Sequence, residues 1–212
     1  MKCKKKHVAF LMGGLSSERD VSINSGNACY DAIDKEKYHA TKIIVDKNFY
    51  NQILTIKPDI CFNALHGSFG EDGTIQSILN KIKMPYTHSG ANASVIAMNK
   101  LLTKNYLGQL SKKTAEPIIF PKTFDFNSIN EYKRFLPLVL KPISGGSSVD
   151  IDILNNEDDL YYVADKLFSN LFIVEPLVGN RELTVSVLEN KPLVVTEIIS
   201  KKNYFYDYNS KY

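Results

Sequence analysis

The chain has 212 residues, of which 44% are hydrophobic, so it can bury the core of one large domain or of two smaller ones. The formal net charge is only +3 and the dense basic run is confined to residues 2–6, which argues against a nucleic-acid partner. The three cysteines lie far apart without C-x-x-C spacing, which argues against a disulfide or zinc framework. With no apolar stretch long enough to cross a membrane, we expect a cytoplasmic protein with small-molecule partners.

The first 90 residues alternate strand and helix patterns, which predicts a parallel α/β lobe. Strands are expected at residues 8–12, 38–45 and 60–64. The helix after the Gly13-Gly14 turn should bury a face formed by Val21, Ser25, Ala28, Cys29, Ala32 and Ile33. Ligands of such lobes bind at the carboxyl ends of the strands, so residues 13–18 and 66–73 should share one rim.

Charged side chains on this rim are candidates for substrate binding. Glu18 could hold a substrate ammonium group, although a carboxylate is also favourable in the first turn of any helix. His66 is either a ligand contact or a packed, hydrogen-bonded histidine. Glu71 and Asp72 are expected to cap the following helix, with Asp72 as its N-cap. G-x-G-x-x-G, nucleophile-elbow and H-E-x-x-H motifs are absent, so NAD binding and hydrolase chemistry have little support.

A second lobe should follow residues 87–90. It should open with one long helix over residues 92–110, which contains Lys100. Residues 156–159 should cap a later helix, and Lys166 should only complement the C-terminus of that helix. Two final strands, at residues 181–188 and 193–199, should leave an apolar face and an unpaired edge exposed.

The most informative segment is a lysine followed at once by a glycine loop. Lys141 ends an apolar run and precedes Pro-Ile-Ser-Gly-Gly-Ser-Ser-Val, residues 142–149. The lysine supplies positive charge, and Gly145 and Gly146 let backbone N–H groups approach an anion without interference from Cβ atoms. The order differs from a Walker P-loop, in which the lysine follows the glycines. The pattern predicts a hairpin lid over a nucleotide, with an ordinary Gly-Ser hairpin as the open alternative.

A turn further along offers groups that suit an adenine. Residues 175–178, Glu-Pro-Leu-Val, end one strand and precede Glu182. The backbone of such a turn can pair with an adenine edge, and its carboxylates with the amino group or the ribose. A plain β-turn fits the spacing equally well.

The chain also carries an ordered set of short motifs. They are Gly13-Gly-Leu-Ser-Ser-Glu-Arg-Asp-Val-Ser22, residues 65–76, Pro85-Tyr-Thr87, Met98-Asn-Lys100, Leu140-Lys-Pro142, residues 145–149, Arg181-Glu-Leu-Thr-Val185 and Phe205-Tyr-Asp-Tyr-Asn-Ser-Lys-Tyr212. In order and spacing they resemble the D-alanine–D-alanine ligase family of ATP-grasp enzymes, which acts in peptidoglycan synthesis. The resemblance covers essentially the whole chain.

The resemblance implies an α/β fold in three parts. Residues 1–88 would form a parallel α/β amino-terminal lobe that binds substrate, and residues 89–176 a central ATP-grasp lobe with the glycine-rich lid. Residues 177–212 would begin a carboxy-terminal ATP-grasp lobe. The implied chemistry is transfer of the γ-phosphoryl group of ATP to the carboxylate of one D-alanine, followed by attack of the amine of a second D-alanine on the acyl phosphate.

The resemblance also implies roles for particular residues. Glu18 would orient the ammonium group of the first D-alanine, and His66 would lie near its carboxylate. Glu18, Ser147 and Tyr212 would form a catalytic hydrogen-bonded cluster that closes the site. The ATP-binding residues would be Lys100 and Lys141 on the phosphates, Gly145, Gly146, Ser147, Ser148 and Val149 in the lid, Glu175 at the adenine amino group, Leu177 and Val178 at the ring edge through their backbone, and Glu182 at the ribose.

The sequence departs from the family pattern in three ways. His88 and Asp150 each stand where the family usually has glycine. The acids that bind Mg²⁺ or Mn²⁺ in the family lie beyond the position of Tyr212, so no metal ligand is expected here. Phosphoryl transfer by this chain alone should therefore be severely impaired. We interpret the chain as the amino-terminal two-thirds of a ligase.

Two alternatives stay open at this point. The chain could be a non-catalytic remnant, or half of a split ligase that needs a second polypeptide. It could also belong to a ligase whose second substrate is D-lactate or D-serine. A homodimer is expected from the family's usual assembly.

Overall fold

The computed structural model describes residues 5–118, 132–162, 166, 171–179 and 181–199. The chain divides into two compact units between Tyr106 and Leu107, and each is described here by itself. The domain limits expected from the sequence, at 88/89 and 176/177, remain a prediction.

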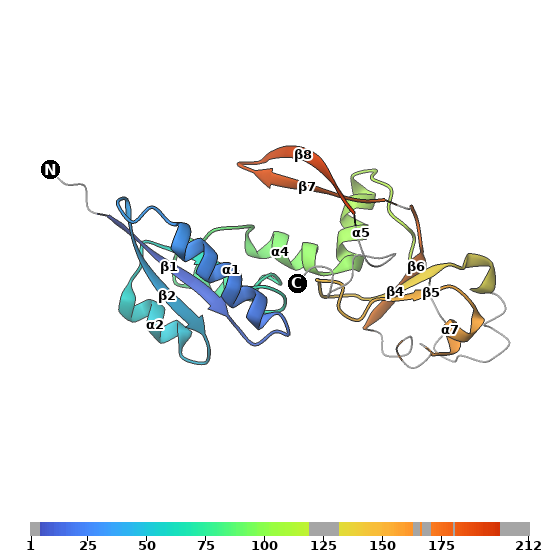
Figure 1. Ribbon diagram of the computed structural model, residues 1–212, viewed down its shortest axis with the longest axis horizontal. Helices are drawn as coiled ribbons and strands as arrows, with labels where there is room; N and C mark the ends of the chain where they lie inside the picture. The colour runs from blue at the N-terminus through green and yellow to red at the C-terminus, as the bar shows by residue number, and fades with distance from the viewer. Residues whose placement is uncertain (1–4, 119–131, 163–165, 167–170, 180, 200–212) are drawn as a thin grey trace. The chain divides into compact units, whose positions relative to one another are not determined.

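The first unit contains a parallel sheet with the strand order β2-β1-β3 (Figure 1). Its strands are β1 (Lys6–Gly13), β2 (Tyr38–Val45) and β3 (Ile60–Asn63). The expected strands are thus confirmed, and β2 has the predicted limits. Because β1 is central, it is buried on both faces, and apolar residues occupy every position from Val8 to Met12.

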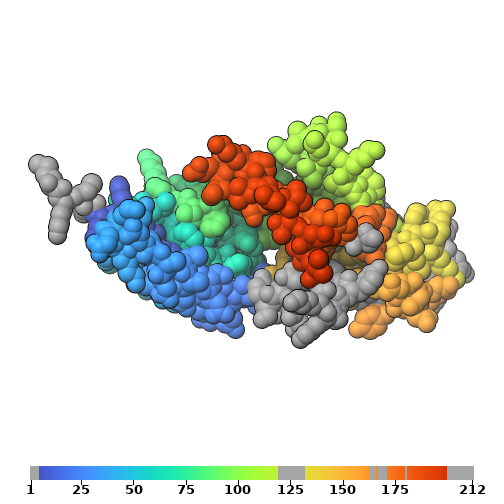
Figure 2. All heavy atoms as spheres, turned by 45° about the horizontal axis from the view of Figure 1, so that its top comes forward, coloured from blue at the N-terminus to red at the C-terminus, as the bar shows by residue number. Residues whose placement is uncertain are grey.

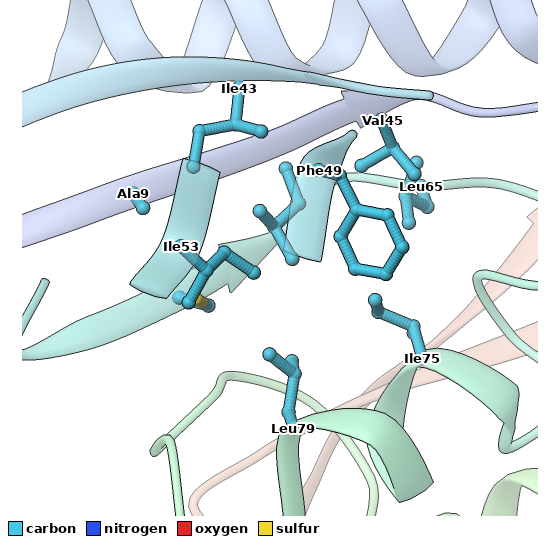
Figure 3. Close-up of a cluster of buried hydrophobic side chains, with 10 residues drawn as sticks. Ala9, Ile43, Val45, Phe49, Ile53, Leu65, Ile75 and Leu79 are labelled. Atoms are coloured by element: carbon cyan, nitrogen blue, oxygen red, sulfur yellow. The ribbon is translucent and has the colours of Figure 1, made fainter. Parts of the chain in front are cut away.

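Helices cover both faces of this sheet. The first, α1 (Arg19–Ala32), packs on the face of Phe10 and Met12, and α2 (Phe49–Ile56) and α3 (Thr74–Lys81) pack on the other. Figure 3 shows the face that α2 and α3 cover, where side chains of these two helices meet those of the sheet. The labelled residues are Ala9, Ile43, Val45, Phe49, Ile53, Leu65, Ile75 and Leu79. Each large apolar side chain buried here contributes about 1.5–3 kcal/mol.

The buried face of α1 differs from the prediction. Its fully packed residues are Ser22 and Gly26, whereas Ala28 is exposed. A Cβ atom added to Gly26 would lie 2.7 Å from both Cβ and Cε of Met12. The helix therefore approaches β1 through its smallest residues, and apolar periodicity alone could not identify that face.

The single long helix expected over residues 92–110 is wrong. The structure has α4 (Ala91–Met98) and α5 (Lys100–Gln109) instead. Asn99 between them has extended backbone angles, and its Oδ1 accepts the N–H groups of Leu101 and Leu102, each at 3.0 Å. Asn99 thus ends one helix and caps the next, since its short amide side chain suits an N-terminus.

The second unit contains an antiparallel sheet with the strand order β5-β4-β6. A short 3₁₀ helix, η1 (Lys133–Phe135), precedes β4 (Leu138–Pro142), which is followed by β5 (Asp152–Leu154), α7 (Glu157–Tyr162) and β6 (Phe172–Pro176). The core consists of Leu138, Leu140, Leu154, Leu160 and Val174. The predicted cap of α7 is confirmed, because Asn156 Oδ1 accepts the N–H of Asp159 while Asp159 Oδ2 accepts the N–H groups of Asn155 and Asn156.

A two-stranded hairpin completes the described residues of this unit. It is formed by β7 (Glu182–Leu188) and β8 (Lys191–Ile198), and Glu189 and Asn190 at its turn both have positive φ. Every residue of β7 is exposed, and the side chains of β8, drawn with those of β7 in red in Figure 2, include Val194 at 81% exposure. The expected exposure of apolar residues on these strands is confirmed.

Candidate active site

The carboxyl ends of β1 and β3 are tied together by one buried hydroxyl. Gly13, the last residue of β1, and Gly14 both have a φ of 86°, a region that favours glycine. The N–H of Gly13 donates to Oγ of Ser22 at 2.9 Å, and that hydroxyl donates to the carbonyl of Ala64 at 2.7 Å. The two loops that leave these strands therefore start from a fixed position.

The two predicted rim segments lie against each other. The hydroxyl of Ser16 donates to the carbonyl of His66 at 2.7 Å and accepts the N–H of Glu18 at 3.2 Å. Glu18 is only 5% exposed, and a Cβ atom added to Gly67 would lie 2.5 Å from its Oε2. The carboxylate of Glu18 and the loop that carries His66 are thus in contact at this rim.

The loop of residues 65–73 is held by buried polar side chains. The carbonyl of Gly70 accepts hydrogen bonds from the amide groups of Asn63, at 2.9 Å, and Gln76, at 2.8 Å. A Cβ atom added to Gly70 would lie 2.4 Å from Cβ of Leu65, so only glycine fits there. The loop is therefore preorganised by the two elements that it joins.

Glu71 and Asp72 accept hydrogen bonds mainly from the backbone of their own loop, and less from the helix α3 that follows. Oε2 of Glu71 accepts the N–H of Gly67 at 2.8 Å, so its predicted role as a helix cap is wrong. The residue before α3 is Gly73 and not Asp72, although Oδ1 of Asp72 does accept the N–H of Thr74. Burial opposes ionisation of Asp72, but the N–H groups of Phe69 and Thr74 outweigh it and lower the pKa of the carboxyl.

The two histidines that the sequence singled out, His66 and His88, both have polar partners. Nε2 of His66 lies 3.1 Å from Oγ of Ser25 on α1. His88 has a φ of 80°, its Nδ1 lies 2.8 Å from Oγ1 of Thr87, and its ring packs edge-on against Phe62. His88 therefore keeps the left-handed backbone that suits glycine, the residue the family resemblance predicts there.

In the second unit, Lys141 and Glu175 form a shielded ion pair. They lie on the adjacent strands β4 and β6, and Nζ of Lys141 is 2.7 Å from Oε1 of Glu175. The side chain of Lys141 is 25% exposed and that of Glu175 only 6%. The sequence placed both residues at a nucleotide but did not predict their pairing, because they are 34 residues apart.

The glycine loop forms the predicted hairpin between β4 and β5. Ser147 and Ser148 both have positive φ, and the N–H of Val149 donates to the carbonyl of Gly146 at 3.2 Å. A Cβ atom added to Gly146 would meet no atom of the described residues within 4 Å. Asp150, like His88, has a left-handed backbone, with a φ of 55°. Among the described residues, the loop therefore leaves space beside Gly146.

Lys166 does more than complement a helix terminus, so that prediction is wrong. Its Nζ lies 2.6 Å from Oδ2 of Asp152, the first residue of β5. The hydrogen bond to Asp152 raises the pKa of Lys166, and the charge of Asp150 acts in the same direction. Lys166 thus anchors the strand that follows the glycine loop.

The remaining predicted residues are spread over both units. Lys100 begins α5 in the first unit, and Glu182 begins β7 in the second. The N–H of Leu177 donates to the carbonyl of Pro137 at 2.9 Å, so this residue can offer only its carbonyl to an adenine. Tyr212 lies outside the described residues. The cluster expected from Glu18, Ser147 and Tyr212 stays a prediction.

Other chemistries find little support in the part of the chain that the structure describes. Burial raises the pKa of the Cys61 thiol to about 12, which removes it as a nucleophile at neutral pH. Within the described ranges, no three His, Cys, Asp or Glu side chains gather in a way that suits a metal ion. None of the described helices has the length and apolar content that a membrane span requires.

Sequence reasoning missed the hydroxyls that organise the rim. Ser16, Ser22 and Ser25 each bond to a residue more than eight positions away. Their spacing after the Gly13-Gly14 turn was a usable signal, because Ser22 and Ser25 recur at helical intervals.

Solved structures identify the class to which this fold belongs. A D-alanine–D-alanine ligase from Bacillus anthracis superimposes with a TM-score of 0.81 at 33% identity, over 97% of this chain and 68% of that one. The same species' enzyme in complex with ATP gives a TM-score of 0.79 at 30% identity. The fold is that of the ATP-grasp ligases.

Sequence comparison narrows the class to one family. The family models described as "D-ala D-ala ligase N-terminus" and "D-ala D-ala ligase C-terminus" match residues 7–54 and 49–89, and residues 121–212. The D-alanine–D-alanine ligase of Bartonella henselae is 39% identical over 99% of this chain and 69% of its own length. D-alanine–D-alanine ligase B of Mesorhizobium japonicum is 41% identical, with 99% and 68% covered. The chain belongs to the D-alanine–D-alanine ligase family of carbon–nitrogen ligases.

Proposed function

We propose that this chain binds D-alanine and ATP for the synthesis of D-alanyl-D-alanine, a cytoplasmic step of peptidoglycan synthesis. The observation that carries the proposal is the rim of the first unit, where buried Glu18 touches the loop of His66. A carboxylate and an imidazole on one rim suit the ammonium and carboxylate groups of a small amino acid.

Glu18 would hold the ammonium group of the first D-alanine. Its burial strengthens the attraction, because the charges interact across little water. Because Gly67 has no Cβ atom, the carboxylate of Glu18 fits beside it. The hydrogen bond from Ser16 to His66 holds the two rim segments together. His66 would bind the substrate's carboxylate.

The second unit would hold the nucleotide. Lys141 fits the phosphates, because it stands at the start of a hairpin whose Gly146 leaves space for an anion to approach the backbone. Its partner Glu175 fits the adenine amino group. ATP, when bound, supplies the phosphoryl group that activates the carboxylate of the first D-alanine for attack by the amine of the second. The other proposed contacts in this unit are residues 145–149, the carbonyl of Leu177, the backbone of Val178 and Glu182. Lys100, which belongs to the first unit, is proposed for the phosphates from the family resemblance alone.

Mg²⁺ is part of the proposal only through the family resemblance. The described residues offer no acidic cluster that fits the ion, so we derive no step through it.

The direct test is calorimetric titration of the purified chain with D-alanine and with ATP. We expect Glu18→Gln to lose D-alanine binding while it keeps ATP affinity, since the two sites use different residues. Wild-type protein that binds neither D-alanine nor ATP would refute the proposal.

A second candidate assigns turnover to a complex of this chain with another polypeptide. The exposed apolar side chains of β7 and β8 favour it, because such surfaces are usually covered by a partner. D-alanine-dependent release of ADP separates the two when it is measured for the chain alone and for the chain with the carboxy-terminal third of a relative added as a separate polypeptide. Steady turnover by the chain alone would reject this candidate.

A further inference from the structure

The imidazole of His66 contacts a hydroxyl from another element of its unit. Nε2 of His66 lies 3.1 Å from Oγ of Ser25, which is on α1 and 41 residues earlier in the chain. Both residues are half-buried. A serine hydroxyl can donate or accept a hydrogen bond, so the contact is compatible with either neutral tautomer of the ring.

Ser25 is held by close contacts on both sides of it along α1. Ser22, fully buried, bonds to Gly13 at the end of β1 and to Ala64 after β3. Gly26 packs against Met12 with no room for a Cβ atom. The hydroxyl of Ser25 is therefore presented to His66 from a fixed helix, which positions a group more accurately than a loop does.

The backbone of His66 is also fixed. Its carbonyl accepts the Ser16 hydroxyl at 2.7 Å, and the next residue, Gly67, has a φ of 70°. With the backbone held, the orientation of the ring depends on contacts of its two nitrogens. A partner at one nitrogen also decides which nitrogen carries the proton.

We propose that Ser25 is a positioning residue of the D-alanine site. Its hydroxyl donates to Nε2 of His66, so the neutral ring carries its proton on Nδ1 and donates that N–H to the carboxylate of the amino-acid substrate. The opposite tautomer would turn an acceptor nitrogen toward a carboxylate, which has only acceptor oxygens when ionised. This inference rests on the proposed function, because it takes the substrate's carboxylate as the partner of His66.

The tautomer can be measured on the whole chain by ¹⁵N-edited NMR of the histidine side chains. We expect the Nδ1–H form of His66 in the wild type and in Ser25→Thr, which keeps the hydroxyl. Ser25→Ala should move the ring toward the Nε2–H form. Asn24→Ala, an exposed neighbour on α1, is the matched control and should leave the ring unchanged.

Titration with D-alanine gives an independent measurement. Ser25→Ala should weaken D-alanine binding about tenfold, the effect of one hydrogen bond, while Ser25→Thr and Asn24→Ala should bind like the wild type. A wild-type ring in the Nε2–H form, or a tautomer that does not respond to Ser25→Ala, would overturn the proposal. If Ser25→Ala changes the tautomer as expected but the wild-type protein does not bind D-alanine, the proposed function would be overturned instead.

Discussion

The rim of the first unit and the glycine loop of the second are both built from loops rich in glycine, but their glycines do opposite things. At the rim, added Cβ atoms on Gly67 and Gly70 would lie within 2.5 Å of a carboxylate oxygen or of another side chain. At Gly146 an added Cβ atom meets no described atom within 4 Å. The rim glycines permit close packing, whereas those of the loop leave open space.

This difference separates two ways of binding a ligand. The rim is preorganised by hydrogen bonds that the side chains of Ser16, Ser22 and Glu71 make with the backbone, so little order has to be created when a small amino acid binds. In the glycine loop, the described residues leave space beside Gly146, where a larger ligand could approach the backbone.

The largest expected effect is the difference in stability between an alanine at a rim glycine, Gly67, and an alanine at a loop glycine, Gly146. Gly67→Ala should cost about 2–4 kcal/mol in the free energy of unfolding, because it adds a positive-φ strain and a clash with Glu18. Gly146→Ala should stay within about 0.5 kcal/mol. Urea unfolding of both variants tests the comparison, and equal losses would contradict it.

The next effect concerns the two lysines of the second unit. Lys141→Ala should weaken ATP binding at least about tenfold, because a charge-assisted contact is lost. It should also destabilise the fold, since the shielded Glu175 loses a partner. Lys166→Ala removes a half-exposed pair with Asp152 and should cost less than about 1 kcal/mol. Calorimetric titration with ATP measures the first effect, and equal affinities of the two variants would refute the assignment of Lys141.

A smaller effect is expected at the two positions that replace family glycines. Asp150→Gly should stabilise the chain by about 0.5–1 kcal/mol, because glycine relieves the left-handed backbone but adds freedom to the unfolded chain. His88→Gly should stabilise the chain less, since this variant also loses the contacts of His88 with Thr87 and Phe62. Thermal unfolding of the single variants checks the order of the two gains, and a loss in Asp150→Gly would show that this backbone is not strained.

The smallest effect is a dependence of the free energy of unfolding on pH between pH 7 and pH 5, which should arise from His7 of the first unit. Burial and the neighbouring His39 lower the pKa of His7, against the attraction of Asp59. The native state therefore disfavours the charged ring of His7. The contribution of His7 to the free energy of unfolding is complete above the usual pKa of about 6.5 and is lost as the pH falls below that value. His7→Gln should flatten this loss in unfolding curves recorded between pH 7 and pH 5.

The sequence was sufficient where a local pattern decides the structure. The limits of β2, the capping of α7 by Asn156 and Asp159, and the hairpin after Lys141 all follow from short-range rules. The buried face of α1 could not be predicted, because it depends on the closeness of Gly26 to Met12. Local apolar periodicity also continued through Asn99, where the side chain caps a new helix.

The assignment of the candidate-site residues to ligands stays a prediction, whereas their contacts became visible only in the structure. Motif order placed Glu18, His66, Lys141 and Glu175 at ligands, but the Lys141–Glu175 and Ser25–His66 contacts join residues more than 30 positions apart. Such pairs depend on how strands and helices pack, and a single sequence contains no direct signal for them.

The burial of Cys61 on β3 of the parallel sheet makes its thiol a probe for the opening of that sheet. An alkylating reagent can reach this sulfur only when β3 separates from its neighbours, whereas the half-buried Cys29 stays accessible from α1. In a chain with Cys3 and Cys29 replaced by serine, the labelling rate at Cys61 would report how often the amino-terminal unit opens. A ligand bound at the rim stabilises the closed sheet, so the labelling rate at Cys61 would fall as the occupancy of the site rises. The thiol would then report ligand binding without contacting the ligand.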